Sequence, residues 1–203
     1  MTTIGIKQDA DLILSHLRSL KDTSWIAESQ SRWPDFLYHF TDIHNAIEIL
    51  RKGELICRSE LESTGSLATD IASPEVISST SDRWKDYVRF YFRPKTPTQY
   101  RNEGFRPRNQ RELGGAHCPV PIFFLFDIKP IVSREETKFS DGNLAADANV
   151  DSTAAFFTSL PFEKIYHERS LWGLDEGEKR KIIFHRHAEV IVPQAVELSS
   201  LKW

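Results

Sequence analysis

The chain has 203 residues, which suits a single domain large enough to bury a core of its own. Hydrophobic residues make up 40% of it and charged residues 27%, as is ordinary for a soluble globular protein. The net charge of −3 excludes a globally basic nucleic-acid-binding protein, so any such surface has to be local.

The sequence does not indicate a membrane protein or a metal-binding protein. No apolar run approaches membrane-spanning length, and the start MTTIGIKQDADLILSHL lacks a basic region followed by an apolar one. We therefore expect no signal peptide and no anchor. Cys57 and Cys118, without CxxC or Cys/His ligand spacing, argue against structural zinc. They fit a reducing compartment, and we expect a cytoplasmic protein without a metal site.

The N-terminal residues 7–21 predict an amphipathic helix that packs on the main domain. The apolar positions that form its stripe are Ala10, Leu12, Ile13, Leu17 and Leu20. We take residues 1–33 as a helical extension and residues 34–203 as the main domain.

The stretch FLYHFTDIHNAIEILRKGEL, residues 36–55, predicts a strand followed directly by a helix. Alternation places Phe36, Tyr38 and Phe40 on one side of the strand and Leu37, His39 and Thr41 on the other. Asp42 is a good N-cap, and Gly53 a good C-terminal stop. The apolar positions grouped on one face of this helix are Ile43, Ala46, Ile47 and Leu50.

His39 and Thr41 stand where the predicted strand meets the helix N-terminus. Free backbone N–H groups there can help to hold a polar ligand. The alternative is a core histidine hydrogen-bonded to the backbone. The segment by itself favours this structural interpretation.

Downstream, the pattern predicts a mixed α/β or α+β domain. Residues 59–81 show little periodicity and indicate a long loop. In YVRFYF, Val88, Phe90 and Phe92 are predicted to be core. The continuous run PVPIFFLFDI, residues 119–128, predicts a strand covered on both faces. A loop and short helix should follow within residues 147–165, and a last strand at residues 189–192.

Positive charge is concentrated between Arg83 and Arg111, with nine Lys or Arg against two acids. Aromatic residues are interleaved with the cations, as at Trp84, Tyr87 and Tyr100. Cations that hold phosphates beside rings that stack on bases suit a single strand of nucleic acid. A solvated edge strand protected by cations is an equally good explanation.

Glu189 opens the last predicted strand, in HRHAEVIVP, with His187 on the same face. A carboxylate entering an apolar strand needs a partner, and Arg186 or a neighbouring strand could supply it. The functional alternative is that it binds a ribose hydroxyl and stabilises positive charge at an anomeric carbon, as carboxylates do in glycosidases.

These segments together resemble the DarT family of DNA ADP-ribosyltransferase toxins. The resemblance runs over about residues 36–193: YHFT followed by Asn45 and Gly53, then YVRFYFRPKTPTQY, then RHAEVIVP. Within it, PKTPTQYRNEG is more similar to the guanosine-modifying branch than to the thymidine-modifying one. The implied fold is α+β, with two packed β-sheets split around an NAD cleft and with flanking helices.

The resemblance also implies roles for individual residues. It makes Glu189 the catalytic carboxylate. The residues that it assigns to NAD⁺ binding are His39, Thr41, Asn45, Gly53 and Tyr91. Arg83 is nominated as the catalytic arginine of the preceding loop. His187 stands where the fold often carries a Gln or Glu that positions the acceptor. Cations assigned to the acceptor strand are Arg89, Arg93, Lys95, Arg106 and Arg108.

The function implied is transfer of ADP-ribose from NAD⁺ to a base, guanine in DNA, of single-stranded nucleic acid. Such an enzyme would act as a toxin or in phage defence, beside an antitoxin that reverses or blocks it. Two alternatives stay open. One is the same enzyme acting on RNA or protein, and the other is a non-catalytic nucleic-acid-binding module in which Glu189 is structural.

Overall fold

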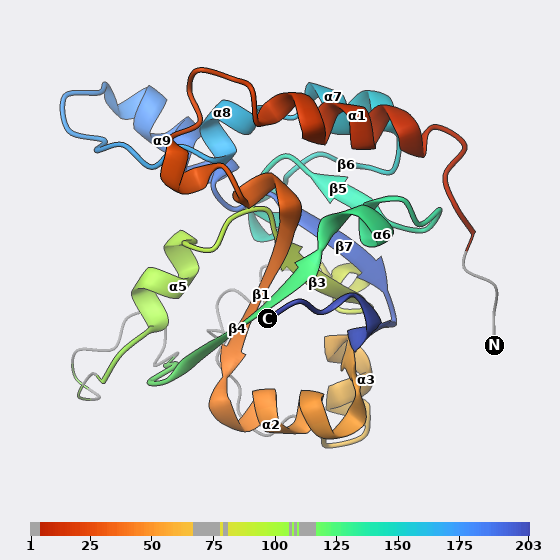
Figure 1. Ribbon diagram of the computed structural model, residues 1–203. Coiled ribbons are helices and arrows are strands. Elements are labelled where there is room, and N and C mark those ends of the chain that lie inside the picture. Colours follow the sequence, from red (N-terminus) through yellow and green to blue (C-terminus); the bar gives the residue numbers. More distant parts are fainter. Residues whose placement is uncertain (1–4, 67–77, 79–80, 106, 108, 110–116) are drawn as a thin grey trace.

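The computed structural model describes residues 5–66, 78, 81–105, 107, 109 and 117–203. In this part the chain forms a mixed α/β fold with one six-stranded and one two-stranded sheet (Figure 1). Helices lie above and below the large sheet in this view. None of the helices in the described part combines the length and apolarity needed to span a bilayer.

The six-stranded sheet runs in the order β4-β1-β3-β7-β5-β6, and all its neighbouring strands are antiparallel. Its strands are β1 Phe36–Asp42, β3 Tyr87–Tyr91, β4 Pro121–Asp127, β5 Lys138–Ser140, β6 Val150–Asp151 and β7 Glu189–Pro193. The small sheet pairs β2 Glu54–Ile56 with β8 Ala195–Glu197.

The large sheet is split between β1 and β3. β1 pairs with β4 along its whole length of seven residues. With β3 it pairs at one position, where Tyr38 lies opposite Tyr91. On the β2 and α2 side of that pair, the two strands line opposite walls of a pocket. The predicted architecture of two sheets around a cleft is confirmed.

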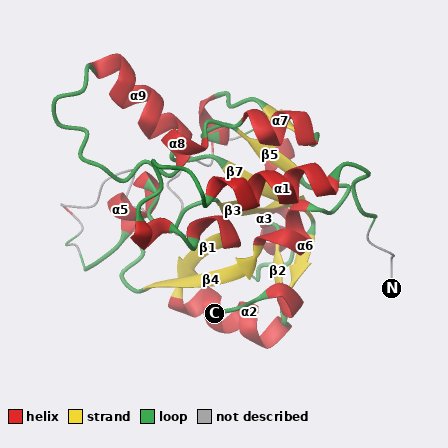
Figure 2. Cartoon of the chain, turned by 45° about the horizontal axis from the view of Figure 1, so that its top comes forward, coloured by secondary structure: helices red, strands yellow, loops and turns green. Residues whose placement is uncertain are grey.

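Helices α1 Ala10–Leu20, α6 Ile128–Val132, α7 Ala154–Ser159 and α8 Phe162–Ile165 cover the sheet, with α1 lying across it in Figure 2. Ile13, Leu17 and Leu20 are buried in the core cluster, so the predicted packing of the N-terminal helix is confirmed. Leu12, which the stripe included, is 62% exposed. The boundary after residue 33 stays a prediction.

The remaining helices lie around the split end and the periphery. They are α2 Ile43–Lys52, α3 Arg58–Ser63, α5 Pro97–Asn102 and α9 Glu176–His185, with 3₁₀ turns at Glu28–Gln30, Trp33–Asp35, Asp82–Trp84, Leu144–Ala146 and Leu198–Ser200. Helix α3 corrects the expectation of an unbroken loop over residues 59–81. Residues 67–77 and 79–80 of that segment lie outside the described part.

The β1–α2 unit forms as its sequence predicts. The Asp42 side chain accepts the backbone N–H of His44, and Gly53 closes α2 at a φ of 78°. A side chain would be strained in that left-handed conformation, which is why glycine suits the position. Of the face grouped from the sequence, Ala46 is buried while Leu50 is 58% exposed. The helix packs through Ala46, which that face included, and through Ile49, which it did not.

The strands differ from their predictions in several respects: β6 lies in the segment predicted as a loop and short helix, β8 follows the strand predicted to be last, and β4 is covered differently. Val88, Phe90 and Phe92 are buried as expected. The run at residues 119–128, however, forms an edge strand, β4, in which Phe124 and Phe126 are buried and the alternate residues are half-buried. Its continuous apolar character therefore does not reflect cover on both faces.

Candidate active site

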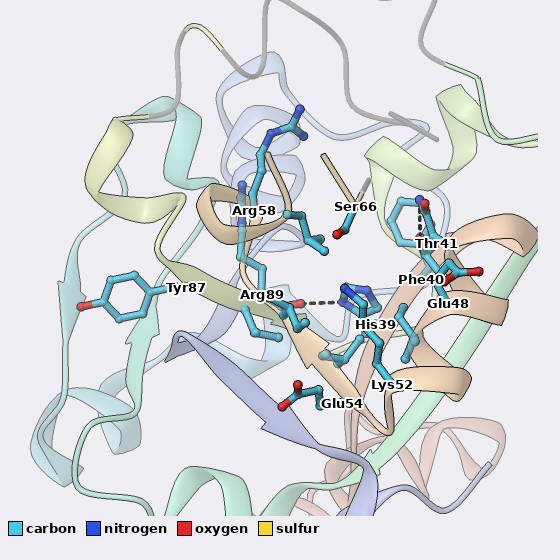
Figure 3. A pocket seen from close by; sticks show the side chains of 16 residues that line it. His39, Phe40, Thr41, Glu48, Lys52, Glu54, Arg58, Ser66, Tyr87 and Arg89 are labelled. Atoms are coloured by element: carbon cyan, nitrogen blue, oxygen red, sulfur yellow. Dashed lines mark hydrogen bonds between the residues drawn. The ribbon is translucent and has the colours of Figure 1, made fainter. Parts of the chain in front are cut away.

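A pocket of about 230 Å³ opens at the split between β1 and β3 (Figure 3). Its walls come from β1, α2, β2, α3 and β3. The polar and charged lining residues are His39, Thr41, Asn45, Glu48, Lys52, Glu54, Arg58, Ser66, Tyr87 and Arg89. Apolar side chains, among them Leu55, Leu61 and Val88, complete it. A concave pocket that combines apolar surface with convergent polar groups is the usual form of a small-molecule site.

His39 lies in the middle of the lining side chains, and a dashed line in Figure 3 marks its bond to Arg89. Its Nδ1 lies 3.0 Å from the Arg89 carbonyl oxygen. Because a carbonyl only accepts, Nδ1 carries the proton. Burial lowers the pKa of His39, although the bond to Arg89 raises it. The imidazole is therefore neutral at pH 7, and Nε2 is an acceptor.

Thr41 and Asn45 form one wall of the pocket together. The Asn45 amide donates to the Thr41 hydroxyl at 3.2 Å, linking the end of β1 to the first turn of α2. Gly53 is not among the lining residues, but Lys52 and Glu54 on either side of it are. Its part is to turn the chain from α2 into β2, so that both neighbours line the pocket.

Glu189 is 1% exposed and is bound by Arg89 from the neighbouring strand. The Arg89 guanidinium donates to both carboxylate oxygens, at 2.5 Å each. The Glu189 backbone N–H donates to the Ser140 hydroxyl at 2.9 Å. Burial raises the pKa of Glu189, and the Arg89 charge opposes the rise. Arg89 lines the pocket, whereas Glu189 is not among the lining residues.

Tyr91 is registered with Glu189 on one side and with Tyr38 on the other. Its ring stacks on Phe40, with centroids 6.2 Å apart and planes inclined by 24°. Burial raises the pKa of the Tyr91 phenol. Phe40 lines the pocket and Tyr91 does not, so contact of Tyr91 with nicotinamide stays a prediction.

The structure does not bring Arg83 into the pocket. Its guanidinium lies over the Trp84 ring, 4.2 Å from the centroid, and lines a neighbouring hollow of about 720 Å³. Arg58, which the sequence analysis did not single out, lines the pocket instead. It opens α3 and pairs with Glu62 at 2.5 Å. No strand was predicted at Glu54–Ile56, so the sequence offered no signal that placed Arg58 in the pocket.

The acceptor-side residues are scattered. His187 is turned toward α9, with Nδ1 2.9 Å from the Ile183 carbonyl oxygen, and does not line the pocket. Arg93 is 3% exposed and donates to two backbone carbonyls and to Glu168. Lys95 also pairs with Glu168 but has a side chain that is 69% exposed. Arg106 and Arg108 lie outside the described residues.

A guanidinium as buried as that of Arg93, with both terminal nitrogens already hydrogen-bonded, is poorly placed to hold phosphate. Arg93→Met should lower the free energy of unfolding by on the order of 2–3 kcal/mol, since it leaves buried acceptors without a donor. Lys95→Ala should leave stability nearly unchanged. It should flatten the slope of log K against log salt for a short single strand by about 0.7.

Urea unfolding and strand titrations over a range of salt would measure both effects. If Arg93→Met has normal stability but a flatter slope of log K against log salt for strand binding, Arg93 contacts the phosphates of the acceptor strand after all. A Lys95→Ala slope equal to that of the wild type would remove Lys95 from it.

The fold and the site define an enzyme of the ADP-ribosyltransferase fold. A family model described as ssDNA thymidine ADP-ribosyltransferase, DarT, matches residues 38–202. The chain belongs to this family. No curated protein matches the chain.

Solved structures support the fold assignment. DarT of Thermus sp. 2.9 in complex with ADP-ribosylated ssDNA has a TM-score of 0.61 and 20% identity, over 83% of this chain and 79% of that one. The same protein with NAD⁺ has a TM-score of 0.60 and 20% identity, over 83% and 80%. DarTG of Thermosipho africanus with ADP-ribose has a TM-score of 0.59 and 18% identity, over 83% and 43%.

The enzyme class predicted from the sequence, an NAD⁺ ADP-ribosyltransferase, is confirmed, and with it NAD⁺ as co-substrate. Among the described residues, no group of three or more His, Cys, Asp or Glu side chains is placed to hold a metal ion. The roles of individual residues stay predictions.

Proposed function

We propose that the chain transfers ADP-ribose from NAD⁺ to a guanine base of single-stranded DNA. The observation that carries the reaction is the pocket at the sheet split, which neutral His39 and Arg89 both line, with the buried Glu189 bound to the Arg89 guanidinium. The nucleic acid comes from the family description and from the DarT structure that contains ADP-ribosylated ssDNA.

In this proposal the pocket residues divide the work. His39 Nε2 accepts a hydrogen bond from a ribose hydroxyl. Thr41 and Asn45 make further contacts with NAD⁺ along the wall of the pocket that they form. Glu189 stabilises positive charge at the anomeric carbon. The bond from that carbon to nicotinamide breaks, and nicotinamide leaves with the electron pair. A base nitrogen then bonds to the carbon and loses its proton to solvent.

The choice of guanine rests on segment 94–104, PKTPTQYRNEG, which resembles the guanosine-modifying branch. The family description names thymidine, so the two bases are the outcomes to separate. In either case the base has to be unpaired to reach the pocket, which favours single strands.

The cellular role that we propose is that of a toxin in a toxin–antitoxin or phage-defence pair, acting in the cytoplasm. An enzyme that modifies DNA bases harms its own cell unless an antitoxin reverses or blocks it. A DarTG protein is among the similar structures, and it was solved with ADP-ribose.

Labelled NAD⁺ incubated with single strands that each lack one base tests the base. We expect label on every strand except the one without guanine, and mass spectrometry of digested nucleosides should find ADP-ribosylated guanosine. Loss of label with the strand lacking thymine would place the chain in the thymidine branch. Label on RNA or protein but not on DNA would overturn the DNA assignment.

A further inference from the structure

Arg89 joins the two halves of the site. Its backbone carbonyl accepts the bond from His39, and its side chain binds Glu189. Among the described residues, Arg89 is the one that both lines the pocket and bonds to the Glu189 side chain. From the sequence, this arginine was predicted to hold phosphates of the acceptor strand.

We propose that Arg89 is a positioning residue for Glu189, which holds the carboxylate ionised and in a fixed orientation at neutral pH. The proposal rests on the proposed catalytic role of Glu189. It moves Arg89 from the nucleic-acid surface to the chemistry of the NAD⁺ pocket.

The geometry of the pair supports the orienting part. Arg89 faces Ile191 across the β3–β7 ladder, and Glu189 faces Tyr91, so the guanidinium reaches diagonally along the sheet. Two parallel N–H···O bonds, from Nε and Nη2, fix the plane of the carboxylate. A lysine has one charged centre and would hold the charge without fixing this plane.

The other groups around Glu189 that the structure describes do not neutralise its negative charge, so Arg89 is the residue that does. Tyr91 on β3 faces the carboxylate and is kept neutral by burial, which raises its pKa. Ser140 on β5 accepts the backbone N–H of Glu189. Lys138, also on β5, donates to the Tyr87 hydroxyl at 3.0 Å. His187 binds the backbone of α9.

In the part of the chain that the structure describes, Arg89 is the cation that pairs with Glu189. Burial and the Glu189 charge act in opposite directions on the pKa of Arg89, which ends above its ordinary value. The guanidinium thus stays protonated at any pH of interest.

Removal of Arg89 should change the pKa of Glu189 in a definite direction. Burial raises the pKa of Glu189, and the Arg89 charge is what opposes it. Without that charge the effect of burial is unopposed, so the pKa of the Glu189 carboxyl rises further and a smaller fraction is ionised at neutral pH. The ionised fraction then grows about tenfold per pH unit below that pKa.

Arg89→Met and Arg89→Lys test the proposal, with Arg18→Met on the exposed face of α1 as the matched control. Transfer is measured from pH 5.5 to 9.5, together with NAD⁺ and strand affinity and the thermal midpoint. We expect Arg89→Met to lose about 100-fold at pH 7 and to recover as pH rises. Arg89→Lys should keep a near-normal pH profile with a reduced maximal rate. Arg18→Met should match the wild type.

NMR of ¹³C-labelled glutamate gives a readout that does not depend on activity. The Glu189 carboxyl should titrate at a higher pH in Arg89→Met than in the wild type. An unshifted titration, or a loss of transfer that is equal at every pH, would overturn the proposal. So would a flattened salt slope for strand binding with normal transfer. A wild type that transfers nothing at any pH would instead be a failure of the proposed function.

Discussion

We expect Glu189→Gln to lose nearly all transfer of ADP-ribose while the protein stays folded and binds NAD⁺ with nearly unchanged affinity. The amide has almost the same shape but no negative charge, so it cannot stabilise positive charge at the anomeric carbon. Loss of one such electrostatic contact costs about 100- to 1,000-fold in rate. Labelled-NAD⁺ transfer in a single turnover, with calorimetry for affinity, measures the two quantities separately.

The control for this variant is Glu197→Gln, at an exposed position of the two-stranded sheet. It makes the same chemical change on β8, outside the pocket lining. We expect it to behave as the wild type. Near-wild-type transfer by Glu189→Gln would leave Glu189 as a structural partner of Arg89. In cells, a lethal wild type beside a tolerated Glu189→Gln would agree with the toxin role.

We expect His39→Ala to weaken NAD⁺ binding by about tenfold, or ~1.4 kcal/mol, because the pocket loses the neutral Nε2 acceptor. The variant also loses the bond from Nδ1 to the Arg89 carbonyl, so a lower thermal midpoint is expected too. Calorimetry at a temperature where the variant is folded separates the two effects. Affinity for a single strand should stay about the same.

The pH dependence of NAD⁺ binding offers an independent check on His39. Burial lowers the pKa of His39, so Nε2 remains an acceptor down to a pH below the ordinary value of about 6.5. Affinity in the wild type should therefore fall only as pH drops through that lowered pKa. In His39→Ala this acid limb should vanish. Unchanged NAD⁺ affinity with a lower thermal midpoint would make His39 a core histidine alone.

Local elements around the site were predictable because their signals lie within a few residues of chain. Asp42 and Gly53 bound α2 through their own backbone and capping preferences. Val88 and Phe90 alternate with Tyr87 and Arg89, and that alternation alone orients the strand. Helix α9 and strand β8 went unpredicted, since α9 lacks a strong apolar periodicity and β8 has three residues.

Partners of the charged side chains could not be predicted in this way. Arg89 and Glu189 are 100 residues apart in the sequence. Arg93 and Glu168, which also form an ion pair, are 75 residues apart. A run of cations therefore looked like one basic surface. In the folded chain Arg89 forms an ion pair with Glu189 in the sheet. Arg93 donates hydrogen bonds to the backbone carbonyls of Ile165 and His167, at the end of α8 and in the turn after it.

By itself, the sequence determined the family, the strand that carries His39, and the position of Glu189 at the start of a buried strand. Tertiary structure decided that Arg58 rather than Arg83 lines the pocket, and that Arg89 is the partner of Glu189. The physical reason is that backbone preferences and alternation act over a few residues. The desolvation of a charge and its pairing depend instead on which strands the fold places side by side.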